Sequence, residues 1–78
     1  MNRDEIYSYI ESILHDEFEI EKDRINPQAN LYTDLEIDSI DAVDLLVYLK
    51  EHTGKKIPPE QFRDVRTIDD VIGAIMAL

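Results

Sequence analysis

The sequence predicts an all-α fold, a small bundle of three main helices plus one short helix, with a long ordered loop between helices one and two. Apolar residues recur three and four positions apart in three segments, which is the spacing of one helix face. A capping pattern opens each of these segments, and no run alternates as a half-buried β-strand does. At 78 residues, the chain has the length of a single domain covering residues 1–78.

The first and last helices are predicted by their caps and apolar stripes. Asn2 with Glu5 forms a capping-box pattern, and so does Thr67 with Asp70. The first stripe consists of Ile6, Ile10, Ile13 and Leu14. The last stripe consists of Ile68, Val71, Ile72, Ile75 and Met76. Between them, segment 57–62 suits a short helical turn, because proline stands at its first positions.

The segment from about residue 19 to residue 38 shows no helical periodicity. It contains Pro27 and several turn formers, but also Ile20, Ile25, Leu31, Leu35 and Ile37. A loop of this length in a compact domain is unusual and often functional. Its apolar residues predict an ordered crossover that is pinned across the helices.

The second main helix should begin at Asp38 or Ser39, with Asp38 as its N-cap and Asp41 at the third helical position. Thr53 and Gly54 supply its end. Its core-facing stripe consists of Ala42, Leu45, Leu46 and Leu49. In the core we expect Ile10, Leu46, Ile68 and Ile72 to be buried.

A second apolar face on the same helix is harder to explain. At about 100° per residue, Ile40, Val43 and Val47 fall beside the core stripe, and Asp41 and Asp44 border them. Two interpretations remain open. Either the fold is thick enough here to bury these residues, or they form a partner-docking surface with an anionic rim.

Composition limits the classes of function. Eighteen acids against eight bases give a net charge of −10, which repels nucleic acids and anionic membranes and attracts basic protein surfaces. The chain has no cysteine, so disulfides, thiolate catalysis and cysteine-ligated metals are excluded. The N-terminus lacks an apolar signal region, and no run approaches membrane-spanning length. We therefore expect a cytoplasmic protein, monomeric when free, without stable membrane insertion.

Asp38-Ser39-Ile40-Asp41 opens a helix after a long loop, and this motif resembles the phosphopantetheine attachment site of acyl carrier proteins. The resemblance covers essentially the whole chain. It includes the first amphipathic helix, the loop, Val43-Asp44-Leu45, and Ile57-Pro58 before the last helix. The runs 38–44 and 53–57 look more like carriers of specialised type II clusters, aryl polyene pathways among them.

The resemblance implies a carrier and not an enzyme, with no metal site of its own. Ser39 would hold 4′-phosphopantetheine covalently, with Asp38 beside it at the metal and basic surface of a phosphopantetheinyl transferase. The thiol of that arm would carry acyl groups as thioesters in fatty acid or polyketide-type biosynthesis. Ketosynthase, acyltransferase, reductase and dehydratase partners would dock through basic patches. Residues matching the family's recognition helix are Ile40, Asp41, Val43, Asp44 and Val47.

Two positions depart from the family's pattern. Glu36 stands where glycine is usual, so the turn before Ser39 is either shaped differently or never needs a positive φ. Lys50 stands where many relatives are acidic, so docking near the helix end should differ.

Other classes of function fit less well. An EF-hand loop would need glycine and glutamate where Ser39 and Leu45 stand. A Ser39–His52 hydrolase pair would be separated by about 20 Å along one helix. His15 would have to come from another helix, and both histidines are better explained as surface residues. An acidic interaction module without a prosthetic group, and a peptidyl or aminoacyl carrier, remain as alternatives.

Overall fold

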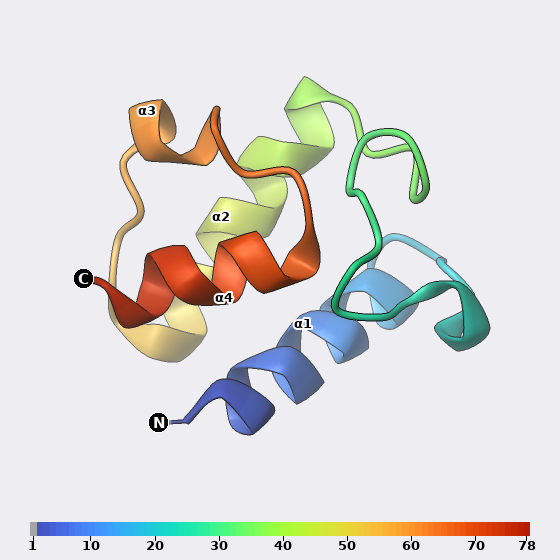
Figure 1. Cartoon of the computed structure of the whole chain (residues 1–78), viewed down its shortest axis with the longest axis horizontal. Helices are drawn as coiled ribbons and strands as arrows, with labels where there is room; N and C mark the ends of the chain where they lie inside the picture. Colours follow the sequence, from blue (N-terminus) through green and yellow to red (C-terminus); the bar gives the residue numbers. More distant parts are fainter. Residues whose placement is uncertain (1) are drawn as a thin grey trace.

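The computed structural model describes residues 2–78, and its architecture is the predicted all-α bundle (Figure 1). The elements in chain order are α1 (Arg3–Asp16), the 3-10 turn η1 (Lys22–Arg24), α2 (Ser39–Thr53), α3 (Pro59–Phe62) and α4 (Ile68–Met76). Helix α1 packs against α2 and α4, and the short α3 packs against α4. The long crossover between α1 and α2 lies beside these helices at one end of the molecule (Figure 1).

The sequence signals for helix ends are confirmed. The Asn2 side chain accepts a hydrogen bond of 2.9 Å from the Glu5 backbone N–H at the start of α1. Helix α2 ends where Gly54 adopts a left-handed φ of 71°, the backbone conformation that glycine tolerates best. Proline occupies the first position of α3, where its missing N–H costs no hydrogen bond.

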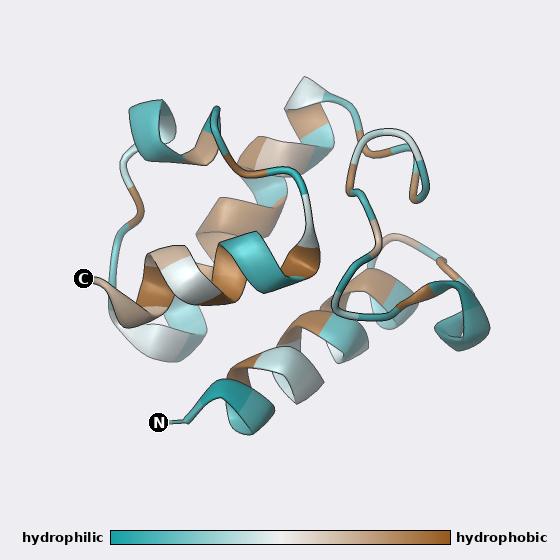
Figure 2. Ribbon diagram, viewed as in Figure 1, coloured by the Kyte–Doolittle hydropathy of each residue, from teal (hydrophilic) through white to brown (hydrophobic). Residues whose placement is uncertain are grey.

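The core forms between the inward faces of the main helices, which appear as brown stripes in Figure 2. Ile10, Ile68 and Ile72 are buried there, as expected. The expectation for Leu46 is wrong, because its side chain is only half-buried. It lies at the border of the core and faces a surface groove between α2 and the α3 segment.

The crossover is ordered and pinned, as its apolar residues predicted. The side chains buried along it belong to Ile20, Ile25, Ala29, Leu31, Leu35 and Ile37. Backbone hydrogen bonds tie it to the approach to α4, from Leu31 N–H to Arg66 O (2.8 Å) and from Ile68 N–H to Ala29 O (3.2 Å). The Asn30 side-chain oxygen also accepts backbone N–H groups of Tyr32 and Thr33. These bonds fix the chain that leads into α2.

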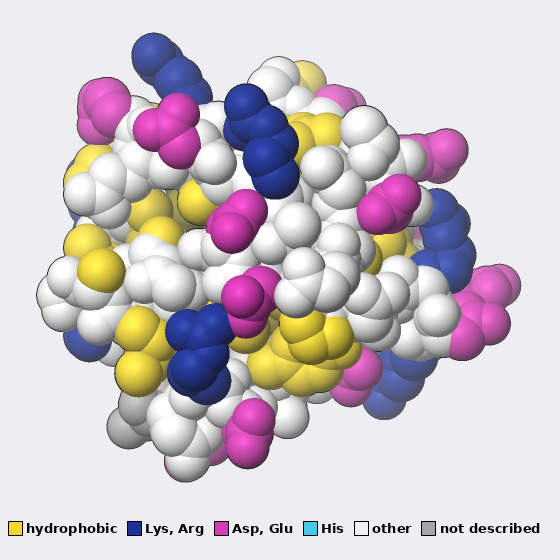
Figure 3. Space-filling view, in the orientation of Figure 1, with side chains coloured by type: hydrophobic (Ala, Val, Ile, Leu, Met, Phe, Trp, Pro, Cys, Tyr) yellow, Lys and Arg dark blue, Asp and Glu magenta, His cyan; other side chains and the backbone are white. Residues whose placement is uncertain are grey.

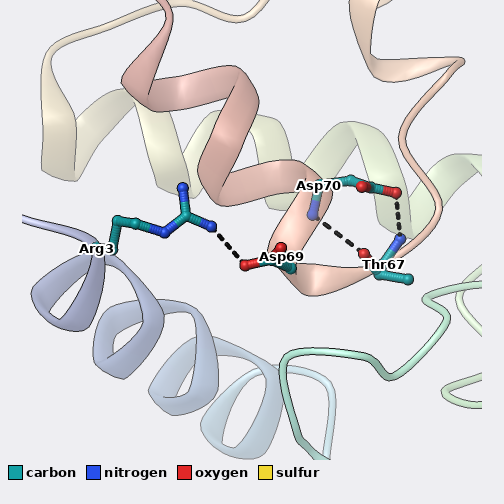
Figure 4. A network of polar contacts seen from close by, with 4 residues as sticks. All are labelled: Arg3, Thr67, Asp69 and Asp70. Atoms are coloured by element: carbon teal, nitrogen blue, oxygen red, sulfur yellow. Dashed lines mark hydrogen bonds and ion pairs between the residues drawn. The ribbon is translucent and has the colours of Figure 1, made fainter.

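Helix α4 is held at its N-terminus by the predicted capping box (Figure 4). The Thr67 hydroxyl accepts the Asp70 N–H, and the Asp70 carboxylate accepts the N–H groups of Thr67 and Arg66. These N–H groups, Thr67 first, lower the pKa of the Asp70 carboxyl below its usual value. Arg3 pairs with Asp69, and within residues 2–78 this is the one ion pair.

Helices of the described part of the chain are too short or too polar to cross a bilayer.

Candidate functional site

Ser39 is the first residue of α2, and its side chain is exposed. The preceding residue, Asp38, caps the helix, because one carboxylate oxygen accepts the backbone N–H groups of Ile40 (3.0 Å) and Asp41 (2.9 Å). Ile37, one residue earlier, is buried and donates its N–H to Leu31 O at 2.9 Å. The crossover and the cap together present the Ser39 hydroxyl at the positive end of the α2 dipole, where anions are favoured.

Glu36, three residues before Ser39, has a φ of 57°. The turn therefore adopts the left-handed backbone that glycine favours, and the alternative that it never needs a positive φ is wrong. Such a conformation costs an L-residue roughly 1–2 kcal/mol. The buried neighbours Leu35 and Ile37 hold the chain on both sides of Glu36 and impose this conformation.

The second face of α2 lies outside the core. Ile40, Val43 and Val47 expose 72%, 59% and 51% of their surface, so we call them the exposed apolar strip. The alternative that the fold buries these residues is wrong, because α2 buries only Ala42, Leu45 and Leu49. Three large apolar side chains left in water along one helix are typical of an interaction site.

Acidic side chains border the exposed apolar strip and also occur over the rest of the surface. Asp44 is exposed beside the strip and Asp41 is half-buried. On the face drawn in Figure 3, acidic side chains are spread over the surface with patches of apolar atoms between them. With a net charge of −10 and little internal pairing, the surface favours basic partners.

Beside Ser39, a groove runs between α2 and the segment that contains α3, and we call it the α2–α3 groove. Its first pocket, of about 260 Å³, is lined by Tyr32, Ser39, Ala42, Val43, Leu46, Pro59, Phe62 and Arg63. Its second pocket, of about 230 Å³, is lined by Val43, Leu46, Val47, Lys50, Lys56, Ile57 and Pro59. The two pockets share Val43, Leu46 and Pro59, so they form one mostly apolar channel with Ser39 in the lining of its first part.

The contacts that hold α2 against α1 could not be predicted from the sequence. The Tyr9 ring stacks on His52 with centroids 3.6 Å apart, and the Tyr9 hydroxyl donates to Tyr48 O at 3.0 Å. The Tyr48 hydroxyl donates to the Glu17 carboxylate, and this hydrogen bond is the main reason that the pKa of Tyr48 is raised. These contacts position the C-terminal half of α2 through groups that follow no helical periodicity.

The structure does not bring Ser39 and the histidines together. His52 lies at the opposite end of α2 and stacks on Tyr9, while His15 Nδ1 contacts Ile20 O at 3.0 Å. Within residues 2–78, no cluster of histidine, aspartate and glutamate side chains is placed to hold a metal ion. The features that gather at Ser39 are a helix N-terminus, a capping carboxylate, an apolar strip and a groove.

This combination leaves the Ser39 side chain open to a second protein. The family described as phosphopantetheine attachment site matches residues 8–75 of this chain. The chain belongs to that family, as an acyl carrier protein. Acyl carrier protein 2 of Ralstonia nicotianae is 49% identical over 78 residues, which cover 100% of this chain and 96% of that protein.

More distant relatives lead to the same family. The acyl carrier protein of Lactobacillus acidophilus is 33% identical over 75 residues, which cover 96% of this chain and 94% of that protein. In three dimensions, the acyl carrier protein of Enterococcus faecalis superposes with a TM-score of 0.81 at 27% identity, covering 99% of this chain and 98% of that one. The family carries acyl groups and catalyses no reaction itself, so the expectations of a carrier and of a phosphopantetheine cofactor are confirmed.

Proposed function

We propose that Ser39 is the residue that holds the phosphopantetheine arm of this carrier. The observation that carries the proposal is its position at the exposed N-terminus of α2 and at the mouth of the α2–α3 groove. The chain has two other serines, Ser8 and Ser12, and both lie within α1. Neither has a helix N-terminus or the groove beside it.

Ser39 acts as the nucleophile when phosphopantetheine is transferred from coenzyme A. In the active site of a Mg²⁺-dependent transferase, its Oγ attacks the pyrophosphate of coenzyme A. An oxygen–phosphorus bond to Ser39 forms, the pyrophosphate bond breaks, and adenosine 3′,5′-bisphosphate leaves. The hydroxyl proton passes to a base of the transferase. The exposure of Ser39 supports this, because a second protein must reach the hydroxyl.

The residues around Ser39 divide the work of recognition. Asp38 presents its second carboxylate oxygen to the metal and basic surface of the transferase, while the first caps α2. Asp41 and Asp44 steer basic partners toward the helix, and the exposed apolar strip supplies contact area. Recognition therefore uses both the acidic side chains and the exposed apolar strip of α2.

Beyond the transferase, we expect the ketosynthase, acyltransferase, reductase and dehydratase of one fatty acid or polyketide-type pathway to dock on the same helix. That this chain serves a specialised type II cluster, such as an aryl polyene pathway, stays a prediction. The cytoplasm is the expected compartment, since coenzyme A must supply the arm.

Mass spectrometry tests the attachment site. We expect incubation with coenzyme A, Mg²⁺ and a broad-specificity phosphopantetheinyl transferase to add one phosphopantetheine to the wild type and to Ser12→Ala. Ser39→Ala should gain nothing. A mass increment that survives Ser39→Ala, or no increment in the wild type, would reject Ser39 as the site.

A further inference from the structure

The α2–α3 groove carries charge of one sign, against the trend of the whole molecule. Among the charged residues that line it, Lys50 and Lys56 lie in the pocket farther from Ser39, and Arg63 lies beside Ser39. Acids do not line either pocket within the described residues. The chain has 18 acids and only 8 bases, so three charged residues drawn at random would usually include an acid.

The two lysines also come from different elements. Lys50 lies in the last turns of α2, and Lys56 lies in the segment between α2 and α3. Both reach the same pocket, whose other lining residues are apolar or proline: Val43, Leu46, Val47, Ile57 and Pro59. An apolar channel with two exposed lysines lining its far end matches a ligand with an apolar body and an anionic end.

We propose that the α2–α3 groove binds acyl groups that end in a free carboxylate, which Lys50 and Lys56 receive. This inference rests on the proposed function, because the arm on Ser39 delivers the acyl group. Lys50 follows Ser39 by eleven residues, so about 16 Å of helix separates the two ends of the groove. An extended phosphopantetheine arm is at least as long as this separation, so the arm must fold back near Ser39, and only the acyl group then lies along the groove toward the lysines.

Electrostatics predicts the direction in which binding in the groove shifts the pKa of the acyl group's free carboxyl. A carboxylate placed at random on a protein of net charge −10 is repelled, and repulsion raises its pKa. Two lysines within contact distance have the opposite effect and lower that pKa. The apolar walls strengthen the attraction, since they reduce the local dielectric. The pKa of the cargo's own carboxyl therefore reports where it lies.

The experiment uses two acyl groups of six carbons. A broad-specificity transferase loads the apo protein from adipoyl-coenzyme A, labelled with ¹³C at the free carboxyl, or from hexanoyl-coenzyme A as the uncharged match. We expect ¹³C NMR titration to give an adipoyl carboxyl that binds its proton at least threefold more weakly on the wild type than in adipoyl-coenzyme A. Circular dichroism verifies that the fold persists at each pH used.

Matched variants identify the lysines. In Lys50→Gln/Lys56→Gln the lowering should disappear, while Lys55→Gln, which changes an exposed neighbour outside the groove lining, should keep it. The adipoyl form should also gain more thermal stability over the apo form than the hexanoyl form does, and only with both lysines present. A carboxyl pKa equal to or above that in adipoyl-coenzyme A, or lowering that survives the double variant, overturns the proposal. Failure of either acyl group to load onto Ser39 would instead reject the proposed function.

Discussion

Helices α2 and α4 are both rich in apolar residues, but they use them differently. Helix α4 has nine residues and buries four of them: Ile68, Val71, Ile72 and Ile75. Helix α2 has 15 residues and buries only three: Ala42, Leu45 and Leu49. The remaining large apolar side chains of α2 line the α2–α3 groove or form the exposed apolar strip.

We interpret this difference as a separation of the residues that stabilise the fold from those that we propose recognise partners. Burial of apolar surface drives folding, so the outward side chains of α2 contribute little to the folded state. They persist in water where a partner or a carried group can cover them. One face of α2 therefore folds the protein and the rest of the helix is available for function, whereas most of the apolar residues of α4 are buried in the core.

The largest effect expected from this division concerns truncation on the two faces of α2. Leu45 is fully buried, so Leu45→Ala should lower the free energy of unfolding by about 2–5 kcal/mol. Val47→Ala on the exposed apolar strip should change it by no more than about 0.5 kcal/mol. Urea denaturation measures both. Similar losses in the two variants would show that the strip shares in the core.

The helix caps offer a second comparison between α2 and α4. Thr67→Ala and Asp38→Ala each remove a side chain that accepts backbone N–H groups, and each should cost about 0.5–2 kcal/mol in urea denaturation. Asp38→Asn should restore most of that stability, because asparagine also caps helices. Attachment of the arm to Asp38→Asn should nevertheless remain slow if the transferase needs the charge. Normal attachment kinetics in this variant would limit Asp38 to capping.

The left-handed turn before α2 predicts a gain in stability. Glu36→Gly removes a conformational penalty of roughly 1–2 kcal/mol and adds an entropy cost of roughly 0.5–1 kcal/mol. The variant should therefore be more stable than the wild type, by up to about 1.5 kcal/mol. Glu36→Ala, which removes the charge but keeps the strain, is the control. If both variants gain equally, charge repulsion and not backbone strain is the cause.

The smallest effect concerns pH at the start of α4. The backbone N–H of Thr67 lowers the pKa of Asp70, so the ionised carboxyl stabilises the folded state above its usual pKa near 3.8. That contribution is lost as the pH falls through the lowered value. Because Asp70 is exposed, Asp70→Asn should cost no more than about 0.5 kcal/mol at pH 7. The difference from the wild type should shrink below pH 3.8, as thermal melts at several pH values can show.

The sequence predicted those parts of the fold that follow from local rules. Apolar spacing located the core of α1 and of α4, except that Met76 at the end of α4 is exposed and not buried. The caps at Asn2, Asp38 and Thr67 located the helix starts. The phasing of α2 placed the exposed apolar strip beside the core stripe. These features depend on residues within one or two helical turns, so a single sequence is enough to find them.

The errors have a different physical origin. Leu46 shares the apolar character and the spacing of Leu45, and only the position of the α3 segment decides that it borders a groove. Glu36 takes a left-handed backbone because its neighbours Leu35 and Ile37 are buried, and their burial depends on how the crossover packs on the helices. The grouping of Lys50, Lys56 and Arg63 around the groove likewise depends on tertiary packing.

The dissociation rate of Val47→Asp from the phosphopantetheinyl transferase tests the division of α2 most directly. Half of the Val47 surface is exposed, so the variant should melt within a few degrees of the wild type. In the complex the new carboxylate is desolvated in an apolar contact, and dissociation should be at least tenfold faster. Asp44→Lys, by contrast, should slow association and weaken its salt dependence. Dissociation of folded Val47→Asp at the wild-type rate, or loss of its fold, would contradict the separation of recognition from stability on α2.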